Sequence, residues 1–248
     1  MKLDLLAFAA HPDDIELTCG GSIIKMASKG YQIGIIDLTR GELGTRGDAK
    51  IRQEESSKAA KIMGVTLREN LGFSDGNIEI NQENRLKVIR LIRQYRPSLI
   101  FLPYWQGRHF DHIHCSQLVS QSAFYAGLAK IETGQEAYRP LRLIYYMCRQ
   151  EFRPSFIVDI SHYFADKMKA IKAYKSQFGN SEAVKAVPTA LSIPSFLRGI
   201  EIRARYYGSL IGIDYGEPFY VKEALKIEDP LEFFKGIDPL RAVNTLED

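Results

Sequence analysis

Two short clusters of histidine and aspartate hold the residue types that hydrolytic chemistry needs. The first, HPDD at residues 11–14, follows an apolar run, and the second, HFDH at residues 109–112, comes much later in the chain. Within each cluster, ligand-type side chains lie three residues apart, a spacing that can bring both to one point in a turn or a first helical turn. Two histidines and a carboxylate around an open position form a catalytic zinc arrangement. The spacing therefore indicates a metal site.

The adjacent carboxylates Asp13 and Asp14 raise a question of charge, because they follow a segment that reads as a buried strand. Two like charges at such a place are costly unless a cation lies beside them. A divalent cation held by Asp14 would offset the repulsion and keep both groups ionised. The alternative is that these residues are ordinary polar loop residues, or that one aspartate caps the following helix. The second cluster makes that alternative less favourable.

The elements that position these clusters alternate between strand and helix. This alternation implies right-handed βαβ units and predicts an α/β, Rossmann-like three-layer fold with a mostly parallel sheet. Strands are expected at residues 3–10, 31–39, 67–73, 98–104, 142–148 and 155–160, and helices at 14–30, 49–64, 81–97, 111–130, 161–178 and from 194 to near Gly208.

Polar residues follow the carboxyl ends of the first four expected strands. In an open parallel sheet, ligands bind beyond those ends, so the polar groups should converge on one edge and form an active site with a metal site there. The groups are His11, Asp13 and Asp14; Thr39, Arg40 and Glu42; Ser74 and Asp75; and Tyr104, Arg108, His109, Asp111 and His112.

Composition is typical of a soluble globular protein. The 248 residues suit one domain spanning 1–248, with residues from about 225 to 248 as a surface extension or an oligomer contact. The net charge of +3 is dispersed, which argues against a nucleic-acid partner, and no stretch is long and apolar enough to cross a membrane. Three widely spaced cysteines read as reduced thiols, so we expect a cytoplasmic protein.

Two further motifs admit a structural and a functional interpretation. The glycine pair in Gly20–Ser22 lacks a complete phosphate-binding pattern, so close helix packing is the better explanation for it. The loop TRGELGTRGDAKIRQEE, residues 39–55, is either a solvated mixed-charge loop or a substrate-binding loop. Its position favours substrate contact by Glu42, Arg46 and Arg52, since arginine binds carboxylates through paired hydrogen bonds. His114 and His162 are expected to be ordinary polar residues.

The motif AHPDD at residues 10–14, with Glu16, GGS at residues 20–22 and the later HFDH, resembles the PIG-L/LmbE-like family of zinc-dependent N-deacetylases. The resemblance runs over most of the chain. The stretches GYQIGIIDLT, IRQEESSKAAKIMGV and AYKSQF are most similar to the branch that deacetylates N-acetylglucosaminyl-malate in bacillithiol biosynthesis. Phe110 departs from the family, which commonly has proline there, and Phe196 lies near the place where some members use a tyrosine.

The resemblance implies a role for each residue that matches the family motif. It implies one Zn²⁺ per chain, or another divalent metal, and a small-molecule N-acetylglucosaminyl substrate. It also implies a homo-oligomer, commonly a hexamer in this branch. The metal ligands would be His11, Asp14 and His112, and Asp13 would be the general base. His109, oriented by Asp111, would stabilise the oxyanion or protonate the leaving amine. The substrate-binding residues would be Arg52, Arg108 and Arg139.

The resulting hypothesis is metal-assisted amide hydrolysis, in which Asp13 takes a proton from a water activated by zinc. Deacetylation of another N-acetyl sugar or of a mycothiol-type precursor is an alternative within the same chemistry. A metal-dependent phosphoesterase and a non-catalytic sugar-binding module are alternatives from other classes. The phosphoesterase would be favoured by a second carboxylate-rich metal site, which the sequence does not indicate.

Overall fold

The computed structural model describes residues 1–178, 189, 191 and 193–235. Within that part of the chain, the middle layer is a seven-stranded sheet with the strand order β3-β2-β1-β4-β5-β7-β6. Its strands are β1 (Leu5–Ala9), β2 (Ile33–Thr39), β3 (Leu67–Phe73), β4 (Leu99–Pro103), β5 (Arg142–Tyr146), β6 (Phe156–Asp159) and β7 (Gly216–Tyr220).

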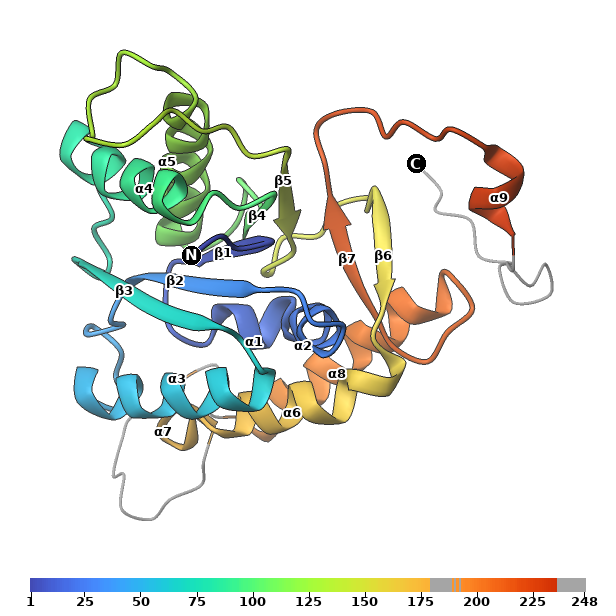
Figure 1. Ribbon diagram of the computed structural model, residues 1–248. Helices are drawn as coiled ribbons and strands as arrows, with labels where there is room; N and C mark the ends of the chain where they lie inside the picture. The colour runs from blue at the N-terminus through green and yellow to red at the C-terminus, as the bar shows by residue number, and fades with distance from the viewer. Residues whose placement is uncertain (179–188, 190, 192, 236–248) are drawn as a thin grey trace.

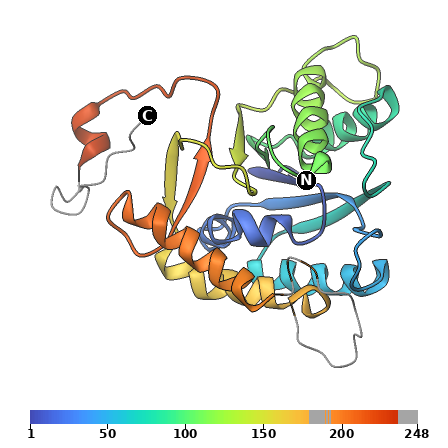
Figure 2. The same ribbon diagram turned by 180° about the vertical axis from the view of Figure 1, so that it is seen from behind.

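Helices cover both faces of this sheet. In Figure 1, α4 and α5 lie on one side of the sheet and the other long helices lie on the opposite side, and Figure 2 shows the same layers from behind. The predicted three-layer α/β fold with a mostly parallel sheet is thereby confirmed. The helices are α1 (Asp14–Thr18), α2 (Gly20–Ser28), α3 (Ala49–Met63), α4 (Gln82–Tyr95), α5 (Phe110–Ala126), α6 (Phe164–Lys172), α7 (Lys175–Phe178), α8 (Pro194–Ser209) and α9 (Pro230–Phe234), with a 3₁₀ turn at Ser161–Tyr163.

The central strand β1 shows why the first apolar run forms a strand. Every residue of β1 is buried, as expected for a parallel strand that is covered on both faces. Leu6 and Phe8 pack into the core on the α4 and α5 side, whereas Leu5 and Ala7 pack into the core on the opposite side. The strand therefore joins the two cores and fixes the point at which the chain emerges as HPDD.

The strand order reverses its direction beside β1. β1 pairs in parallel with β2 on one side and with β4 on the other, with Leu5 opposite both Ile33 and Leu99. The connections from β1 and from β4 leave in opposite directions, which makes this boundary a topological switch point, where open α/β sheets bind their ligands. The segments after β1 and β4 are the two histidine and aspartate clusters.

The predicted helix over residues 14–30 is wrong in one respect, because it breaks at Cys19 into α1 and α2. The break frees the amides of Gly21 and Ser22, which donate to the Glu217 carboxylate at 2.9 and 2.7 Å. A side chain at Gly21 would place its Cβ 2.7 Å from a carbon of Ile160. The glycine pair therefore allows close packing and provides a carboxylate-binding helix start, rather than a phosphate site.

The sequence analysis also missed β7, which is antiparallel to its neighbours β5 and β6. Its sequence, GEPFY, contains glycine and proline, which indicate a turn rather than a strand. Proline is tolerated because β7 pairs with β5 only through Phe219 and Tyr220, so Pro218 lies beyond the end of that ladder. The single helix predicted over residues 161–178 is likewise divided into a 3₁₀ turn, α6 and α7.

The C-terminal part of the described chain extends over the surface. All residues from Lys222 to Lys235 are exposed, and Leu231 in α9 keeps 85% of its surface accessible. Residues 236–248 of the predicted extension lie outside the described residues, and the homo-oligomer stays a prediction. Among the described residues, none of the helices has the length and apolarity to span a membrane.

Candidate metal centre

The side chains of His11, Asp14 and His112 meet at the switch point, and we call them the metal cluster. One ligand atom from each lies within 4.8 Å of the others. Nδ1 of His11 is 3.6 Å from Oδ2 of Asp14, and Nε2 of His112 is 3.1 Å from Oδ1 of the same carboxylate. The first two residues are buried and His112 is half-buried. Two imidazoles and one carboxylate converging in this way fit a divalent metal of the zinc type.

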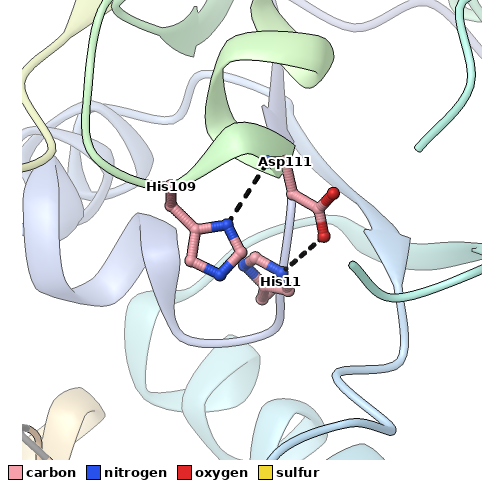
Figure 3. A group of neighbouring side chains, drawn as sticks. All are labelled: His11, His109 and Asp111. Atoms are coloured by element: carbon pink, nitrogen blue, oxygen red, sulfur yellow. Dashed lines mark hydrogen bonds and ion pairs between the residues drawn. The ribbon is translucent and has the colours of Figure 1, made fainter. Parts of the chain in front are cut away.

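Carboxylates outside the metal cluster hold the His11 ring in place. Nε2 of His11 lies 3.2 Å from Asp111 and 3.0 Å from Asp75, as Figure 3 shows for Asp111. The amides of Gly76 and Ile78 in turn donate to Asp111, at 2.7 and 3.4 Å. This arrangement favours the proton on Nε2, so the lone pair of Nδ1 would be the one to bind a metal, as is common where a carboxylate orients a histidine ligand.

The electrostatics of the metal cluster favour a cation. Burial lowers the pKa of His11, but hydrogen bonds to Asp111, Asp14 and Asp75 outweigh burial and raise it well above its usual value. Burial also lowers the pKa of His112, but the negative charge of Asp14 outweighs burial and raises this pKa well above its usual value. Burial raises the pKa of Asp14, yet His112 and His11 bring it well below its usual range. A bound metal replaces such protons, because its ligands must be deprotonated.

Asp13 lies beside the metal cluster with a different partner. Its backbone is left-handed, with φ of 106°, which for a non-glycine residue costs about 1–3 kcal/mol and is concentrated at functional sites. Its carboxylate is buried and lies 3.4 Å from Nη2 of Arg52, whereas Asp14 faces His112. Burial raises the pKa of Asp13 to about 7, although Arg52 acts in the opposite direction. The two adjacent aspartates therefore occupy different environments.

His109 is exposed at the rim of the centre, and its ring centroid lies 4.7 Å from that of His11. Its Nδ1 accepts a hydrogen bond from the backbone amide of Asp111 at 3.3 Å and so caps α5. The Asp111 carboxylate, which the sequence analysis assigned to His109, instead contacts His11 (Figure 3). Burial, followed by the charges of His11 and His112, lowers the pKa of His109. Ligand atoms of His11, His109 and Asp111 also lie within 4.8 Å of one another.

The predicted substrate-binding residues lie at different distances from the centre. Arg52 is buried and donates to the carbonyls of Gly41 and Pro12 at 2.9 and 2.8 Å. It therefore connects the loop after β2 to the HPDD segment after β1, residues 11–14, which we call the metal loop. Arg108 is exposed directly before His109. Arg139 packs over the Phe124 ring near the far end of α5, 5.0 Å from the ring centroid, so the structure does not bring it to the metal cluster.

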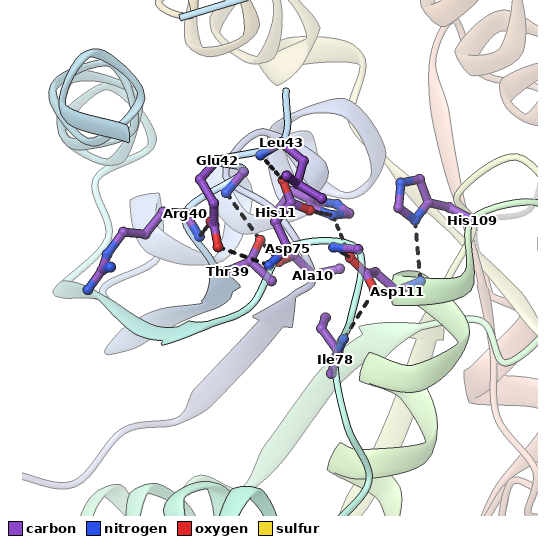
Figure 4. A network of polar contacts seen from close by, with 12 residues as sticks. Ala10, His11, Thr39, Arg40, Glu42, Leu43, Asp75, Ile78, His109 and Asp111 are labelled. Atoms are coloured by element: carbon purple, nitrogen blue, oxygen red, sulfur yellow. Dashed lines mark hydrogen bonds and ion pairs between the residues drawn. The ribbon is translucent and has the colours of Figure 1, made fainter. Parts of the chain in front are cut away.

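The loop after β2 is fastened to the loop after β3 by Glu42. Its carboxylate accepts from the amide of Asp75 at 2.9 Å and from that of Arg40 at 3.2 Å (Figure 4). Arg46 was also predicted to bind substrate, and its backbone carbonyl accepts a hydrogen bond from the side-chain amide of Gln177 at 2.5 Å. Glu42 therefore positions Asp75, which the sequence analysis placed at this edge without assigning it a role. The contact with His11 makes Asp75 a part of the centre. The position of Asp75 directly after β3 was the signal in the sequence that indicated this role.

A second buried charge cluster lies behind the metal loop and was missed from the sequence. Arg68 pairs with Glu16 at 2.5 Å and with both oxygens of Asp37 at 2.7 and 2.9 Å, and we call these three residues the arginine cluster. Tyr174 also donates to Glu16, at 3.0 Å. An aspartate inside the apolar strand IGIIDLT was the available signal, because a buried charge requires a partner.

Two histidines and a carboxylate that fit a metal, with a second carboxylate beside them at the switch point of an open sheet, are the arrangement typical of a metal-dependent hydrolase. The family described as PIG-L, GlcNAc-PI de-N-acetylase, matches residues 6–123, which include both clusters. The chain belongs to the PIG-L family.

Three relatives illustrate the family. The crystal structure of the conserved protein TT1542 from Thermus thermophilus is 37% identical, with a TM-score of 0.82 over 91% of this chain and 98% of that chain. Diacetylchitobiose deacetylase from Thermococcus kodakarensis is 28% identical over 86% of this chain and 80% of its own length. A probable N-acetyl-alpha-D-glucosaminyl L-malate deacetylase 2 from Bacillus anthracis is 24% identical over 68% and 78%. The protein is accordingly an N-deacetylase, a hydrolase of amide bonds.

Proposed function

We propose that the protein is a zinc-dependent hydrolase that removes the acetyl group from an N-acetylglucosaminyl conjugate. The observation that carries the proposal is the metal cluster with Asp13 beside it. Three ligand atoms lie within 4.8 Å of one another, and the neighbouring carboxylate is directed to Arg52 instead. A binding module would need no such unligated carboxylate.

His11, Asp14 and His112 would hold the zinc. When bound there, zinc lowers the pKa of a coordinated water to about 7 and polarises the amide carbonyl. Asp111 and Asp75 keep Nε2 of His11 engaged, so the ring presents Nδ1 in a fixed orientation. This orientation is set before substrate arrives, which avoids a reorganisation cost during the reaction.

Asp13 would accept the proton of the attacking water and pass it to the leaving amine. The guanidinium of Arg52, at 3.4 Å, holds the Asp13 carboxylate and is itself fixed by two backbone carbonyls. His109 lies at the exposed rim beside His11, where its ring can face the amide oxygen on which negative charge develops. Arg108 precedes it and would contact the substrate, as would Arg46.

Two substrates follow from different observations. The sequence resemblance favours N-acetylglucosaminyl-malate, whose carboxylates suit an arginine at the rim such as Arg108. The higher identity to the diacetylchitobiose deacetylase, over a larger share of the chain, favours N,N'-diacetylchitobiose. A mycothiol-type precursor belongs to the same chemical class.

The test is an amine-release assay on N-acetylglucosaminyl-malate, N,N'-diacetylchitobiose and free N-acetylglucosamine, with metal content measured on the same zinc-loaded sample. The proposal predicts release from a conjugate well above release from the free sugar. Equal and weak release from all three would contradict a conjugate substrate. The absence of release from every one, with about one zinc per chain, would contradict the function itself.

A further inference from the structure

A polar cavity of about 290 Å³ lies on the other side of the metal loop, between α3 and the β3 edge of the sheet. No residue of the metal cluster lines it. Its size is at the lower end of small-molecule sites, which is enough for one sugar ring and far more than a single ion needs. Residues with side chains suited to a polar ligand are Arg40, Gln53, Ser56, Ser57 and Asn70, and Pro12 forms the wall shared with the metal loop.

Among the described residues, two arginines and two carboxylates line the cavity, and they differ in their partners. Asp37 and Arg68 both line it, but they bind each other through two hydrogen bonds, and Glu16 completes the pairing. The carboxylate of Glu69 accepts from the hydroxyl of Tyr95. Across the described part of the chain, no carboxylate forms an ion pair with Arg40, whose side chain points away from the metal edge in Figure 4. Arg40 is therefore the cation of the lining that is free to bind an anionic group.

The neutral groups of the lining suit hydroxyls. The hydroxyls of Ser56 and Ser57 both donate to the carbonyl of Gln53, at 2.9 and 2.8 Å, so their oxygens remain able to accept from a ligand. Gln53 is exposed and its side-chain amide can both donate and accept. A wall of this kind recognises a ligand that carries several hydroxyl groups.

Arg52 separates the cavity from the metal cluster. It is buried, and it donates to the carbonyl of Pro12 at 2.8 Å while its Nη2 lies 3.4 Å from Asp13. The lining includes Pro12 but not Asp13, so a ligand in the cavity and a ligand at the metal cluster would contact different residues. The two sites can be occupied and tested independently.

We propose that this cavity is a second binding site, for a small hydroxylated anion such as a sugar acid or a sugar phosphate. Arg40 binds the anionic group, and Gln53 and Ser57 bind the hydroxyls. The site does not depend on the proposed deacetylation, since none of the metal cluster contributes to it. The carboxylate and the phosphate share one chemistry here, namely paired hydrogen bonds from a guanidinium.

Titration calorimetry with four probes tests the proposal: D-glucuronate, D-glucose 6-phosphate, D-glucose and inorganic phosphate. The proposal predicts that at least one of the two sugar anions binds more tightly than either glucose or phosphate, and the stronger of the two distinguishes a sugar acid from a sugar phosphate. The R40Q variant should weaken that binding by about tenfold or more, because it removes a charged hydrogen-bond donor. R90Q, a change at an exposed arginine on α4, should leave it unchanged.

Two further variants locate the binding. H112A removes a residue of the metal cluster and should bind the sugar anion as wild type does. S57F should abolish binding by filling the cavity. Loss of binding in H112A, or unchanged affinity in both R40Q and S57F, would place the anion elsewhere and overturn the proposal. Failure of both sugar anions to bind at about 10 mM, a Kd range of weak ligands, would also overturn it.

Discussion

The metal cluster and the arginine cluster are both buried groups of charge, and α1 contributes one carboxylate to each. Asp14 belongs to the metal cluster, and Glu16, two residues later, belongs to the arginine cluster. In the arginine cluster, one permanent cation satisfies two carboxylates through short hydrogen bonds. In the metal cluster, the only cationic partners of Asp14 among the described residues are imidazoles, which are also able to bind a metal.

This difference teaches which buried charges indicate function. A buried carboxylate alone indicates only that a partner is needed, and a guanidinium with fixed geometry supplies a structural one. A carboxylate that faces two histidines, with a second unligated carboxylate beside it, keeps ligand positions that a cation can take. Substitutions beside the metal cluster should therefore change the chemistry, whereas substitutions in the arginine cluster should change the stability.

The largest effect is expected for D13N. The substitution keeps the shape of Asp13 but removes the base, so kcat should fall by about 10²- to 10⁴-fold, while the metal content remains that of wild type. Steady-state amine release and elemental analysis of the same preparation measure both. D166N, a change at a half-exposed carboxylate on α6, serves as the control. Activity within a few-fold of wild type would remove Asp13 from the mechanism.

R68M should act on stability instead of chemistry. It leaves Glu16 and Asp37 buried without their cation, so the free energy of unfolding should fall by about 3–5 kcal/mol. Urea denaturation measures the loss. K87M breaks an ion pair that is largely exposed and should leave stability nearly unchanged. If R68M were as stable as K87M, the arginine cluster would not have the structural role assigned to it.

D111N tests the contact that the sequence analysis placed differently. Because the Asp111 carboxylate orients His11, its loss should weaken metal affinity by about 10- to 100-fold. Competition with a chelating indicator dye measures the affinity. A normal affinity combined with a lower kcat would support the original assignment of Asp111 to His109.

The smallest effect is a gain in stability for D13G. Glycine adopts the positive φ of residue 13 without strain, so the free energy of unfolding should rise by about 1 kcal/mol even though activity is lost. R96G is the matched control, because Arg96 also has a positive φ but lies far from the metal cluster, and it should gain stability and keep activity. A D13G variant that is less stable than wild type would show that the backbone at Asp13 is not strained.

Alternating apolar segments predicted the parallel sheet, and the order of the strands placed the two clusters at one edge. Local patterns could do this because β1, β2 and β4 are apolar runs bounded by turn residues. Local patterns could not reveal β7, whose glycine and proline read as a turn, nor the break at Cys19, which depends on Glu217 from a distant strand. Both features are decided by tertiary contacts.

The site was predictable at the level of ligand types and not at the level of partners. The spacing within HPDD and HFDH was sufficient to expect a metal site, because the two clusters follow neighbouring strands. The resemblance to the family then implied His11, Asp14 and His112 as the ligands. The partner of Asp111 was not predictable, since the carboxylate extends from the first turn of α5 to reach His11 and the amide of Gly76 from the loop after β3. Arg139 was placed by resemblance, and its packing on α5 depends on the tertiary fold.

The most direct test of the central claim compares the metal content of two histidine variants on α5. His112 is a residue of the metal cluster, and His114, two residues later, lies outside it. Each variant is loaded with zinc, passed over a desalting column and measured by elemental analysis. H114A should retain about one zinc per chain, and H112A should retain almost none, because three protein ligands are needed for a stable site. Stoichiometric zinc in H112A would contradict the account.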